Sequence, residues 1–418
     1  MADPHPDTLD LLRDLLYAEP SPETWAALCD ALDRCPHARL DAALDYARDH
    51  LGRWPDALRP APKAWWDALA DGRHEPRWAL ARTLDLSGAP LPANAIDALL
   101  HNPELGTIAR LNLASAGLTD PCEVLSSRHL THLHALDLSF NAIGDNGAAL
   151  LADNPALAGL RELELCASAI GEVGVAALAD AAHLSGLRRL GLSSNLIGDT
   201  GAAFLARAQA LAGLTDLDLN DAQLHPEGAA AVAVAPFAPS LERMDLSTND
   251  IGSGGVGALC VAPDLRRLRT LILNQSGLDD RAAELLAVAP ALEDLDTLSA
   301  WDNHIGDRGL LALLRGRALR ALSRLDLSAN AITSQGALWL AQLDRLGRLT
   351  HLDLRGNQIA DGGAQMLARA PWLGHLDALK LAGNPIGPRG VDALRRAFAP
   401  IPSLEHDLDA LDDAVLDP

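Results

Sequence analysis

The sequence predicts an α/β solenoid, with a parallel inner sheet, helices that return on the outside, and a small α-helical cap at the N-terminus. The prediction depends on the phrase L-x-x-L-x-L-x-x-N-x-I, which is clearest from Leu322 to Ile332 and recurs around Leu136 and Leu352. Alternating leucines are typical of a short strand that is buried on one face. A phrase that returns at a fixed long period is typical of stacked repeats.

The central leucine of the phrase marks twelve repeats. It is found at Leu84, Leu111, Leu136, Leu163, Leu190, Leu217, Met244, Leu271, Leu298, Leu325, Leu352 and Leu379. Every step is 27 residues except the second, which is 25 residues long and contains Pro121, so we expect an irregular helix there. Because each repeat packs only on its neighbours, residues 81–403 can form one domain despite their number.

Each position in the repeat has a physical role. The leucines point into the core, and the Asn five positions after the central leucine can bond backbone groups of neighbouring turns. A Gly-Asp pair, such as Gly198-Asp199, then opens the helix. Glycine permits the turn, and we expect the Asp to cap the helix that it begins.

The phrase is the leucine-rich-repeat signature. The Asn position alternates between Asn and a smaller residue in the first half of the chain, as at Asn141, Ser168, Asn195 and Ala222. This alternation and the long period resemble the ribonuclease-inhibitor-like class of leucine-rich repeats. The resemblance covers residues 84–400 and implies a horseshoe that binds a protein; some members of the class regulate small GTPases.

Residues 1–80 do not follow the repeat. We expect helices over residues 8–17, 22–33, 39–50 and 63–70. Five of the eight tryptophans lie here: Trp25, Trp54, Trp65, Trp66 and Trp78. Two readings stay open, a cap that closes the end of the solenoid core and a module that docks a partner. The strings EPSPETWAAL (19–28) and RWPDAL (53–58) resemble a companion domain that precedes repeats in some bacterial proteins.

The charge and cysteine content limit the partners and the compartment. The formal net charge is −22, which argues against nucleic acid or an anionic membrane and favours a basic protein partner. The five cysteines are few and far apart, as expected for reduced thiols in a cytoplasm. We find neither a signal-peptide core nor an apolar run long enough to span a membrane.

The last stretch, residues 404–418, is acidic and is expected to be a tail. From Glu405 onward it carries six acids and no Lys or Arg. It is either a solvated segment or one that lies across basic residues of the solenoid.

Three motifs suggest cofactor or metal chemistry, and we assign none of them. The glycines from Gly252 to Gly257 match G-x-G-x-x-G, but they occupy the same repeat offsets as glycines elsewhere in the chain. The histidines at 129, 132 and 134, and the group of Cys29, Cys35 and His37, lack metal-ligand spacing. We therefore predict no enzyme activity, no cofactor and no metal.

The strand residues on either side of the central leucine face away from the core and line the inner, concave surface. One position after the leucine is mostly acidic, and one position before it is partly basic. The two columns either neutralise each other or present charge to a partner. Trp301 stands where other repeats carry small residues, and is either a partner anchor or a ring lying on neighbouring strands. The predicted contact residues are Phe140, Asp218, Arg243, Asp245, Trp301, Asp302, Arg324, Asp326, Asp353 and Arg355.

Together these observations predict a non-catalytic, cytoplasmic scaffold that binds a protein on its concave face, as an inhibitor or regulator of a basic partner. Two alternatives stay open. One is a regulator of a small GTPase, which the family resemblance alone suggests. The other is a structural module that assembles through its N-terminal cap, and the sequence leaves the oligomeric state undecided.

Overall fold

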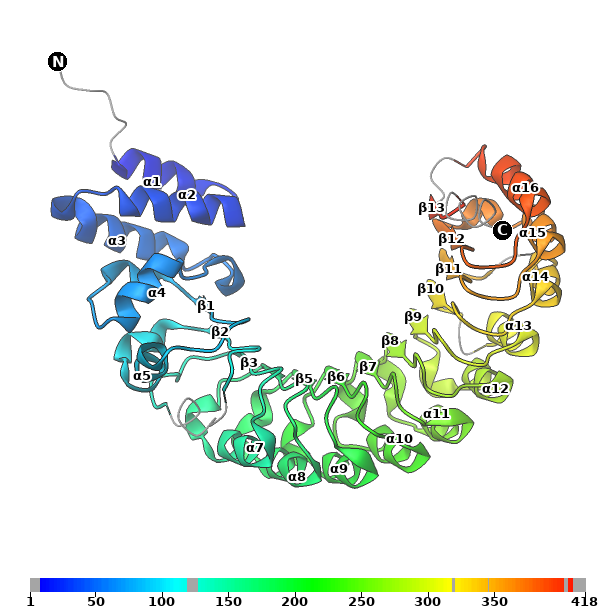
Figure 1. Ribbon diagram of the computed structural model, residues 1–418, viewed down its shortest axis with the longest axis horizontal. Coiled ribbons are helices and arrows are strands. Elements are labelled where there is room, and N and C mark those ends of the chain that lie inside the picture. The colour runs from blue at the N-terminus through cyan, green and yellow to red at the C-terminus, as the bar shows by residue number, and fades with distance from the viewer. Residues whose placement is uncertain (1–7, 119–126, 318–319, 345, 402–404, 409–418) are drawn as a thin grey trace, which may run out of the picture. The chain divides into compact units, whose positions relative to one another are not determined.

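The computed structural model describes residues 8–118, 127–317, 320–344, 346–401 and 405–408 (Figure 1). The chain divides into two compact units: residues 1–169 with 181–187, and residues 170–180 with 188–418. Pro121 and Cys122, and with them the expected irregular helix, lie outside the described residues.

The first unit begins with helices and continues with strand–helix repeats. Its helices are α1 (Thr8–Tyr17), α2 (Pro22–Asp33), α3 (His37–Leu51), α4 (Lys63–Ala70), α5 (Ala93–His101) and α7 (Gly144–Asp153), with 3-10 turns at Asp56–Leu58, Pro76–Leu80, Pro103–Thr107, Pro155–Leu157 and Ala182–Gly186. Its strands are β1 (Thr83–Asp85), β2 (Arg110–Asn112), β3 (Ala135–Asp137) and β4 (Glu162–Glu164). Each strand pairs in parallel with the next, leucine beside leucine.

The N-terminal tryptophans form the core of the helical segment. Trp25, Trp54, Trp65, Trp66 and Trp78 are all buried. Three of the indole N–H groups donate hydrogen bonds inside the unit, to the Pro60 carbonyl, to Asp33 and to the Glu104 carbonyl. The chain at Pro60 also bridges to Thr83, so this segment covers the outer edge of β1.

The second unit continues the same strand–helix alternation. Its helices are α8 (Glu172–Asp180), α9 (Gly198–Leu205), α10 (Pro226–Ala233), α11 (Gly252–Val261), α12 (Asp280–Val288), α13 (Asp307–Arg315), α14 (Ser334–Ala341), α15 (Asp361–Leu367) and α16 (Pro388–Phe398). Its strands are β5 (Arg189–Gly191), β6 (Asp216–Asp218), β7 (Arg243–Asp245), β8 (Thr270–Ile272), β9 (Thr297–Ser299), β10 (Arg324–Asp326), β11 (His351–Asp353), β12 (Ala378–Lys380) and β13 (Glu405–His406). Several 3-10 turns connect them: Gln209–Leu211, Ala238–Ser240, Leu265–Arg267, Pro290–Leu292 and Leu373–His375.

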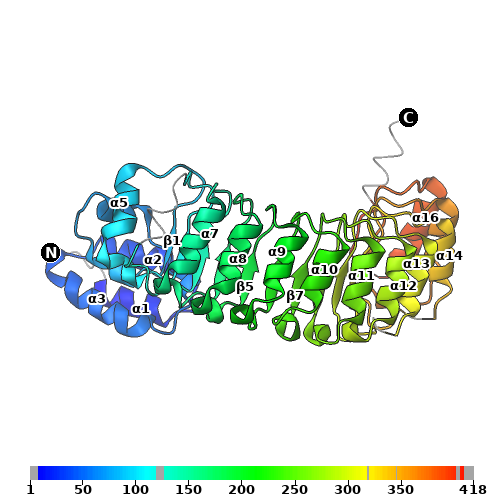
Figure 2. The same ribbon diagram turned by 90° about the horizontal axis from the view of Figure 1, so that it is seen from below.

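The strands of the second unit line its inner, concave side, and the helices cover its outer side (Figure 1). The helices stand side by side in chain order (Figure 2). Each leucine predicted as a strand centre is the middle residue of its strand and is buried. The α/β leucine-rich-repeat solenoid expected from the sequence is therefore confirmed.

A row of buried asparagines connects successive repeats, as the sequence suggested. The Asn303 amide donates to the carbonyls of Ala300 and Trp301 in its own repeat and of Leu273 in the preceding one, at 2.9–3.1 Å. Its oxygen accepts the backbone N–H groups of Ser276 and Leu278. Asn249, Asn330, Asn357 and Asn384 bond their own and preceding repeats in the same way.

The aspartate after the turn glycine does not cap its own helix, which corrects the prediction. Asp199 Oδ1 instead accepts the backbone N–H groups of His225 and Gly228, both at 2.9 Å, where the next helix α10 begins. Asp307 likewise bonds Thr333 ahead of α14, and Asp361 bonds Gly390 in α16. The aspartate therefore joins one repeat to the next, because the following helix start is the nearest set of unpaired N–H groups.

The glycines of the G-x-G-x-x-G string serve the turn and the helix packing. Gly252 has a φ of +51°, which favours glycine. A side chain at Gly255 would lie 2.8 Å from the Ile251 Cβ and 3.1 Å from the Ala229 Cβ. Close packing of α11 on α10 thus requires this glycine.

The acidic stretch does not begin as a free tail, which corrects the boundary at 404. Glu405 and His406 form β13, paired in parallel with Ala378 and Leu379 of β12. Asp407 accepts the N–H groups of Leu381 and Ala382 at 2.7 and 3.0 Å, and Leu408 is buried. The sequence carried the signal, since His406 lies 27 residues after Leu379. Residues 409–418 lie outside the described residues.

Two cysteines are predicted to be chemically inert in the folded chain. Cys29 and Cys260 are buried free thiols, and burial raises the pKa of each to about 12. We expect neither to react with iodoacetamide at pH 8, because the thiolate is the nucleophile. Mass spectrometry of alkylated peptides checks this, with protein unfolded in urea as the positive control. Since these thiols ionise at a lower pH when unfolded, stability should fall as the pH rises from about 9 towards 12.

Candidate functional site

The candidate site is the inner surface of the second unit, where the residues on either side of the buried central strand residue in β5–β12 are exposed or half-buried, except for Gly191 and Ala378, which are buried. Parallel pairing places equivalent residues side by side. Asp326 of β10 pairs with Ser299 on one side and Asp353 on the other, and Asp218 of β6 pairs with Asp245 of β7.

The acidic column has a structural role that the sequence analysis missed. Each aspartate of the column uses Oδ1 to accept the backbone N–H of the residue two positions later, which closes the turn at the strand end. This bond is present at Asp85, Asp137, Asp218, Asp245, Asp326 and Asp353, at 2.9–3.0 Å. Asn112 makes the same bond to Ala114 at 3.0 Å. The bond therefore uses a side-chain oxygen and does not need a charge; the repeats with Gly191 and Ile272 at this position end their strands without it.

The second carboxylate oxygen distinguishes two kinds of acid in the column. Asp353 Oδ2 accepts from the Arg355 guanidinium at 2.9 Å, and Asp245 Oδ2 lies 3.6 Å from Arg243. Among the described residues, Asp218 and Asp326 have no cation within ion-pair distance. These two acids keep an oxygen available for a partner.

Asp218 is the acid of the column whose negative charge is least stabilised by its surroundings. Burial raises the pKa of its carboxyl, and the neighbouring charge of Asp245 raises it further. The hydrogen bond from the Asn220 backbone and the positive charges of Arg243 and Arg189 oppose the rise. A cationic group placed by a partner beside this carboxylate would remove part of the electrostatic cost.

The basic column is neutralised in one part of the sheet and open in another. Arg189 donates to Asp216 at 2.9 Å, and Arg243 lies 3.7 Å from the same carboxylate. Sequence analysis missed Asp216, although it stands in the same column as the arginines. Arg324 of β10 is exposed, and within the described chain its guanidinium makes no ion pair. The two columns therefore neutralise each other in some repeats, and in β10 the basic side chain makes no ion pair within the described chain.

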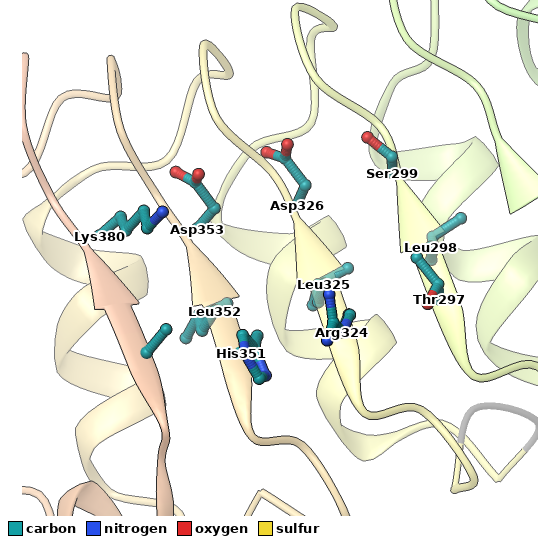
Figure 3. Close-up of a pocket in the computed structure, with 11 residues that line it drawn as sticks. Thr297, Leu298, Ser299, Arg324, Leu325, Asp326, His351, Leu352, Asp353 and Lys380 are labelled. Atoms are coloured by element: carbon teal, nitrogen blue, oxygen red, sulfur yellow. The ribbon is translucent and has the colours of Figure 1, made fainter. Parts of the chain in front are cut away.

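A hollow of about 260 Å³ lies across β9–β12 (Figure 3). Figure 3 shows two rows of side chains, with Ser299, Asp326, Asp353 and Lys380 in one row and Thr297, Arg324 and His351 in the other. The floor between the rows is formed by Leu298, Leu325 and Leu352. The hollow thus combines an apolar floor with one rim that carries two aspartates and Lys380 and another that carries Arg324 and His351, which suits a side chain with both apolar and charged parts.

Trp301 follows the end of β9 and is 41% exposed. Its backbone is fixed, because its N–H donates to Asn274 at 2.9 Å and its carbonyl accepts from Gln275 at 2.8 Å. In the described part of the chain its ring makes no contact with another aromatic ring or with a cation. A backbone fixed by hydrogen bonds and an exposed aromatic ring are properties of a residue that anchors a protein interface.

The other predicted contact residues lie in different surroundings. Asp302 accepts from the Gln275 side chain at 2.8 Å, and Arg355 is held by Asp353, so both are already engaged. Phe140 is 64% exposed and belongs to the first unit. The candidate surface therefore consists of β5–β12 with Trp301.

Metal-binding clusters and membrane-spanning helices are both absent from the described residues. There, neither the histidines at 129, 132 and 134 nor the Cys29 group forms a cluster that could hold a metal ion. In the same part of the chain, none of the helices has both the length and the apolar character needed to span a membrane.

Comparison with known proteins supports the repeat assignment. A family model described as Leucine Rich repeat matches six stretches, at residues 129–152, 183–206, 214–233, 238–260, 349–368 and 375–394. No curated protein matches the sequence closely enough to count as a relative. The matched stretches are thus leucine-rich repeats, and such repeats generally serve as scaffolds for protein interactions.

Solved structures share the fold at low sequence identity. The complex of Rad7 and Elc1 in yeast matches with a TM-score of 0.51 and 18% identity, over 89% of this chain and 90% of that one. The mouse RP105/MD-1 complex matches with a TM-score of 0.51 and 19% identity, over 79% of this chain and 51% of that one. This chain therefore aligns with about half of the mouse chain. At this level of identity the likeness concerns the fold.

Proposed function

We propose that this chain is a non-catalytic scaffold that binds a basic protein on the concave surface formed by β5–β12. The observation that carries the proposal is the placement of Asp218, Asp326 and Trp301. The two carboxylates keep an oxygen free of ion pairs, and the exposed ring stands after β9, next to the strand that carries Asp326.

The charged residues and the aromatic residue would contribute to binding in different ways. Flat, charged surfaces mainly set the association rate and the choice of partner, and buried aromatic residues contribute most of the affinity. The net charge of −22 attracts a basic protein over long range, and the two open carboxylates then accept its Lys or Arg side chains. Arg324 would form an ion pair with an acidic side chain of the same partner.

Two further observations support a protein partner in a reducing compartment. The structures of similar fold include complexes, RP105 with MD-1 and Rad7 with Elc1. Cys29 and Cys260 are free thiols, which suits a cytoplasm. A regulatory role, as an inhibitor of the basic partner, follows if the partner's own basic surface is covered.

Residues 1–80 are proposed to cap the solenoid. Their five tryptophans are buried, so these rings are not available to dock a partner or to drive assembly. The segment also covers the edge of β1, which would otherwise present unpaired backbone groups.

Capture from lysate with matched variants tests the concave surface. Trp301→Ala removes the anchor, and Asp326→Asn removes one charge but keeps the oxygen that closes the turn, as Asn112 does. We expect each to lower the yield of a specific basic protein, Trp301→Ala by about tenfold or more. Quantitative mass spectrometry measures the yield, and capture should weaken as salt is raised.

The control is Asp264→Asn, which makes the same charge change at an exposed residue away from the sheet. It should leave capture unchanged. The proposal is wrong if every captured protein is retained equally by Trp301→Ala, Asp326→Asn and Asp264→Asn.

A further inference from the structure

Three exposed valines form a row on the outer side of the second unit. Val234, Val261 and Val288 stand at the C-terminal ends of α10, α11 and α12, and they are 65%, 81% and 68% exposed. They are 27 residues apart, and each is followed by Ala-Pro. Because α10, α11 and α12 pack in sequence, the three valines lie on neighbouring helices (Figures 1 and 2).

The fold does not require valine at this position. The last turn of a helix favours cations, and valine is a weaker helix former than most charged residues. The flanking repeats follow that rule, with Arg207 after α9 and Arg315 at the end of α13. Exposed apolar residues that repeat in neighbouring positions indicate an interaction surface.

The apolar surface extends one helical turn towards the N-terminal end of each helix. Ala231, Ala258 and Leu285 precede the valines by three residues, share the same helix face, and are half-buried. The surface is therefore a strip across three helices, which we call the valine strip: Val234, Val261, Val288, Ala231, Ala258 and Leu285.

Basic residues continue the row on both sides of the valine strip. The same repeat position holds Arg207 on one side and Arg315, Gln342, Arg369 and Arg396 on the other. The four arginines are exposed, and the row from 207 to 396 contains no acid. Arg396 lies 3.8 Å from Asp392, and the other three arginines leave a local excess of positive charge in a chain whose net charge is −22.

The positive charges beside the valine strip limit which surfaces can bind to it. If two copies paired strip against strip about a two-fold axis, Arg207 of one copy would face Arg315 of the other. Such like-charge contacts oppose self-pairing. The surface that would complement the valine strip and its flanking arginines is an acidic segment that carries aliphatic side chains.

The chain contains a segment of this chemistry at residues 409–418, D-A-L-D-D-A-V-L-D-P. Its acids are Asp409, Asp412, Asp413 and Asp417, and its aliphatic residues include Leu411, Val415 and Leu416, with no Lys or Arg. Ten residues extend at most about 36 Å. Val288 lies four repeats before Arg396, which is about 40 Å at roughly 10 Å per helix. The segment also starts on the strand side, next to β12. A copy therefore cannot cover its own valine strip.

We propose that the valine strip binds the C-terminal segment, residues 409–418, of a second copy of this chain. The contact is head-to-tail, and it uses a surface on the opposite side of the strand–helix layer from the concave site. Leu411 and Val415 would pack on the valines, and the aspartates would meet Arg207 and Arg315.

Sedimentation velocity of the full chain over a wide range of concentration tests the proposal. We expect reversible association that is lost when residues 409–418 are deleted, and that a synthetic peptide of residues 409–418 inhibits. Val261→Thr with Val288→Thr should weaken association about tenfold, because apolar burial is lost. Arg315→Glu should weaken it by a similar factor.

Two control variants separate this surface from others. Val173→Thr changes an exposed valine of α8 outside the row, and Trp301→Ala changes the concave site; neither should alter association. Circular dichroism confirms that each variant is folded. The proposal is overturned if the full chain stays monomeric and the chain lacking residues 409–418 does not bind the peptide. It is also overturned if association survives the deletion, or if the valine and arginine variants bind the peptide as the wild type does.

Discussion

Asn303→Ala is expected to lower the free energy of unfolding by about 3–5 kcal/mol, since a buried polar group left without a partner costs about 1–3 kcal/mol. The substitution removes a side chain that makes five hydrogen bonds across two repeats. It leaves the backbone N–H groups of Ser276 and Leu278, and the carbonyls that faced the amide, buried in a core that contains few other hydrogen-bond partners. Urea unfolding measures the change as a lower midpoint.

The matched control is Asn220→Ala, which removes a half-buried amide whose one described bond is a 3.5 Å contact with Thr248. It should change stability by no more than about 0.5 kcal/mol. Asn303→Asp adds a second test, because it keeps the acceptor and replaces the amide donor with a charge that faces carbonyl oxygens. If both Asn303 variants unfold at the wild-type midpoint, the buried asparagine row does not join the repeats.

Arg59→Ala is expected to destabilise the first unit by about 2–4 kcal/mol, because a hydrogen bond to a charged group contributes about 1.5–3 kcal/mol. Arg59 is 4% exposed. Its guanidinium donates to the Leu80 carbonyl at 2.6 and 3.0 Å and to the Leu51 carbonyl at 3.3 Å, and lies over the Trp25 ring. It therefore links the end of α3 to the turn before β1.

Burial, together with the nearby positive charge of Arg82 and against the opposing charge of Asp56, lowers the pKa of Arg59 to about 10, so the group is still charged at neutral pH. Its charge is held by backbone carbonyls. Arg53→Ala is the control, since Arg53 is exposed six residues away. Thermal unfolding followed by near-UV circular dichroism reports on the tryptophans around Arg59. Equal melting temperatures for the two variants would show that Arg59 has no structural role.

The repeat period made the architecture predictable. A leucine every 27 residues fixes where a strand must be buried, and the strands occupy those positions from Leu84 to Leu379. The helices at 22–33 and 63–70 were also predicted with their observed ends, because Pro22 and Pro62 mark where they start. Local signals suffice where backbone geometry and burial both repeat along the chain.

The candidate site was predictable in outline only. Strand alternation places Asp218, Asp326 and Arg324 on the inner surface, and the break in the pattern singles out Trp301. The partners of each charge depend on distances between repeats. For that reason the sequence could not show that Arg189 is taken by Asp216 of the next repeat, or that Asp326 keeps an oxygen available.

The sequence by itself determined the repeat, its period, the core leucines and the asparagine row, because these obey the spacing rules of strands and turns. Only the tertiary structure decided how one repeat is joined to the next. Asp199 caps the following helix, and His406 extends the sheet where an acidic tail was expected. The physical reason is that a hydrogen bond or ion pair goes to the nearest unpaired group in space. In a stack of repeats that group often belongs to the next turn of the solenoid, some 27 residues away in the chain.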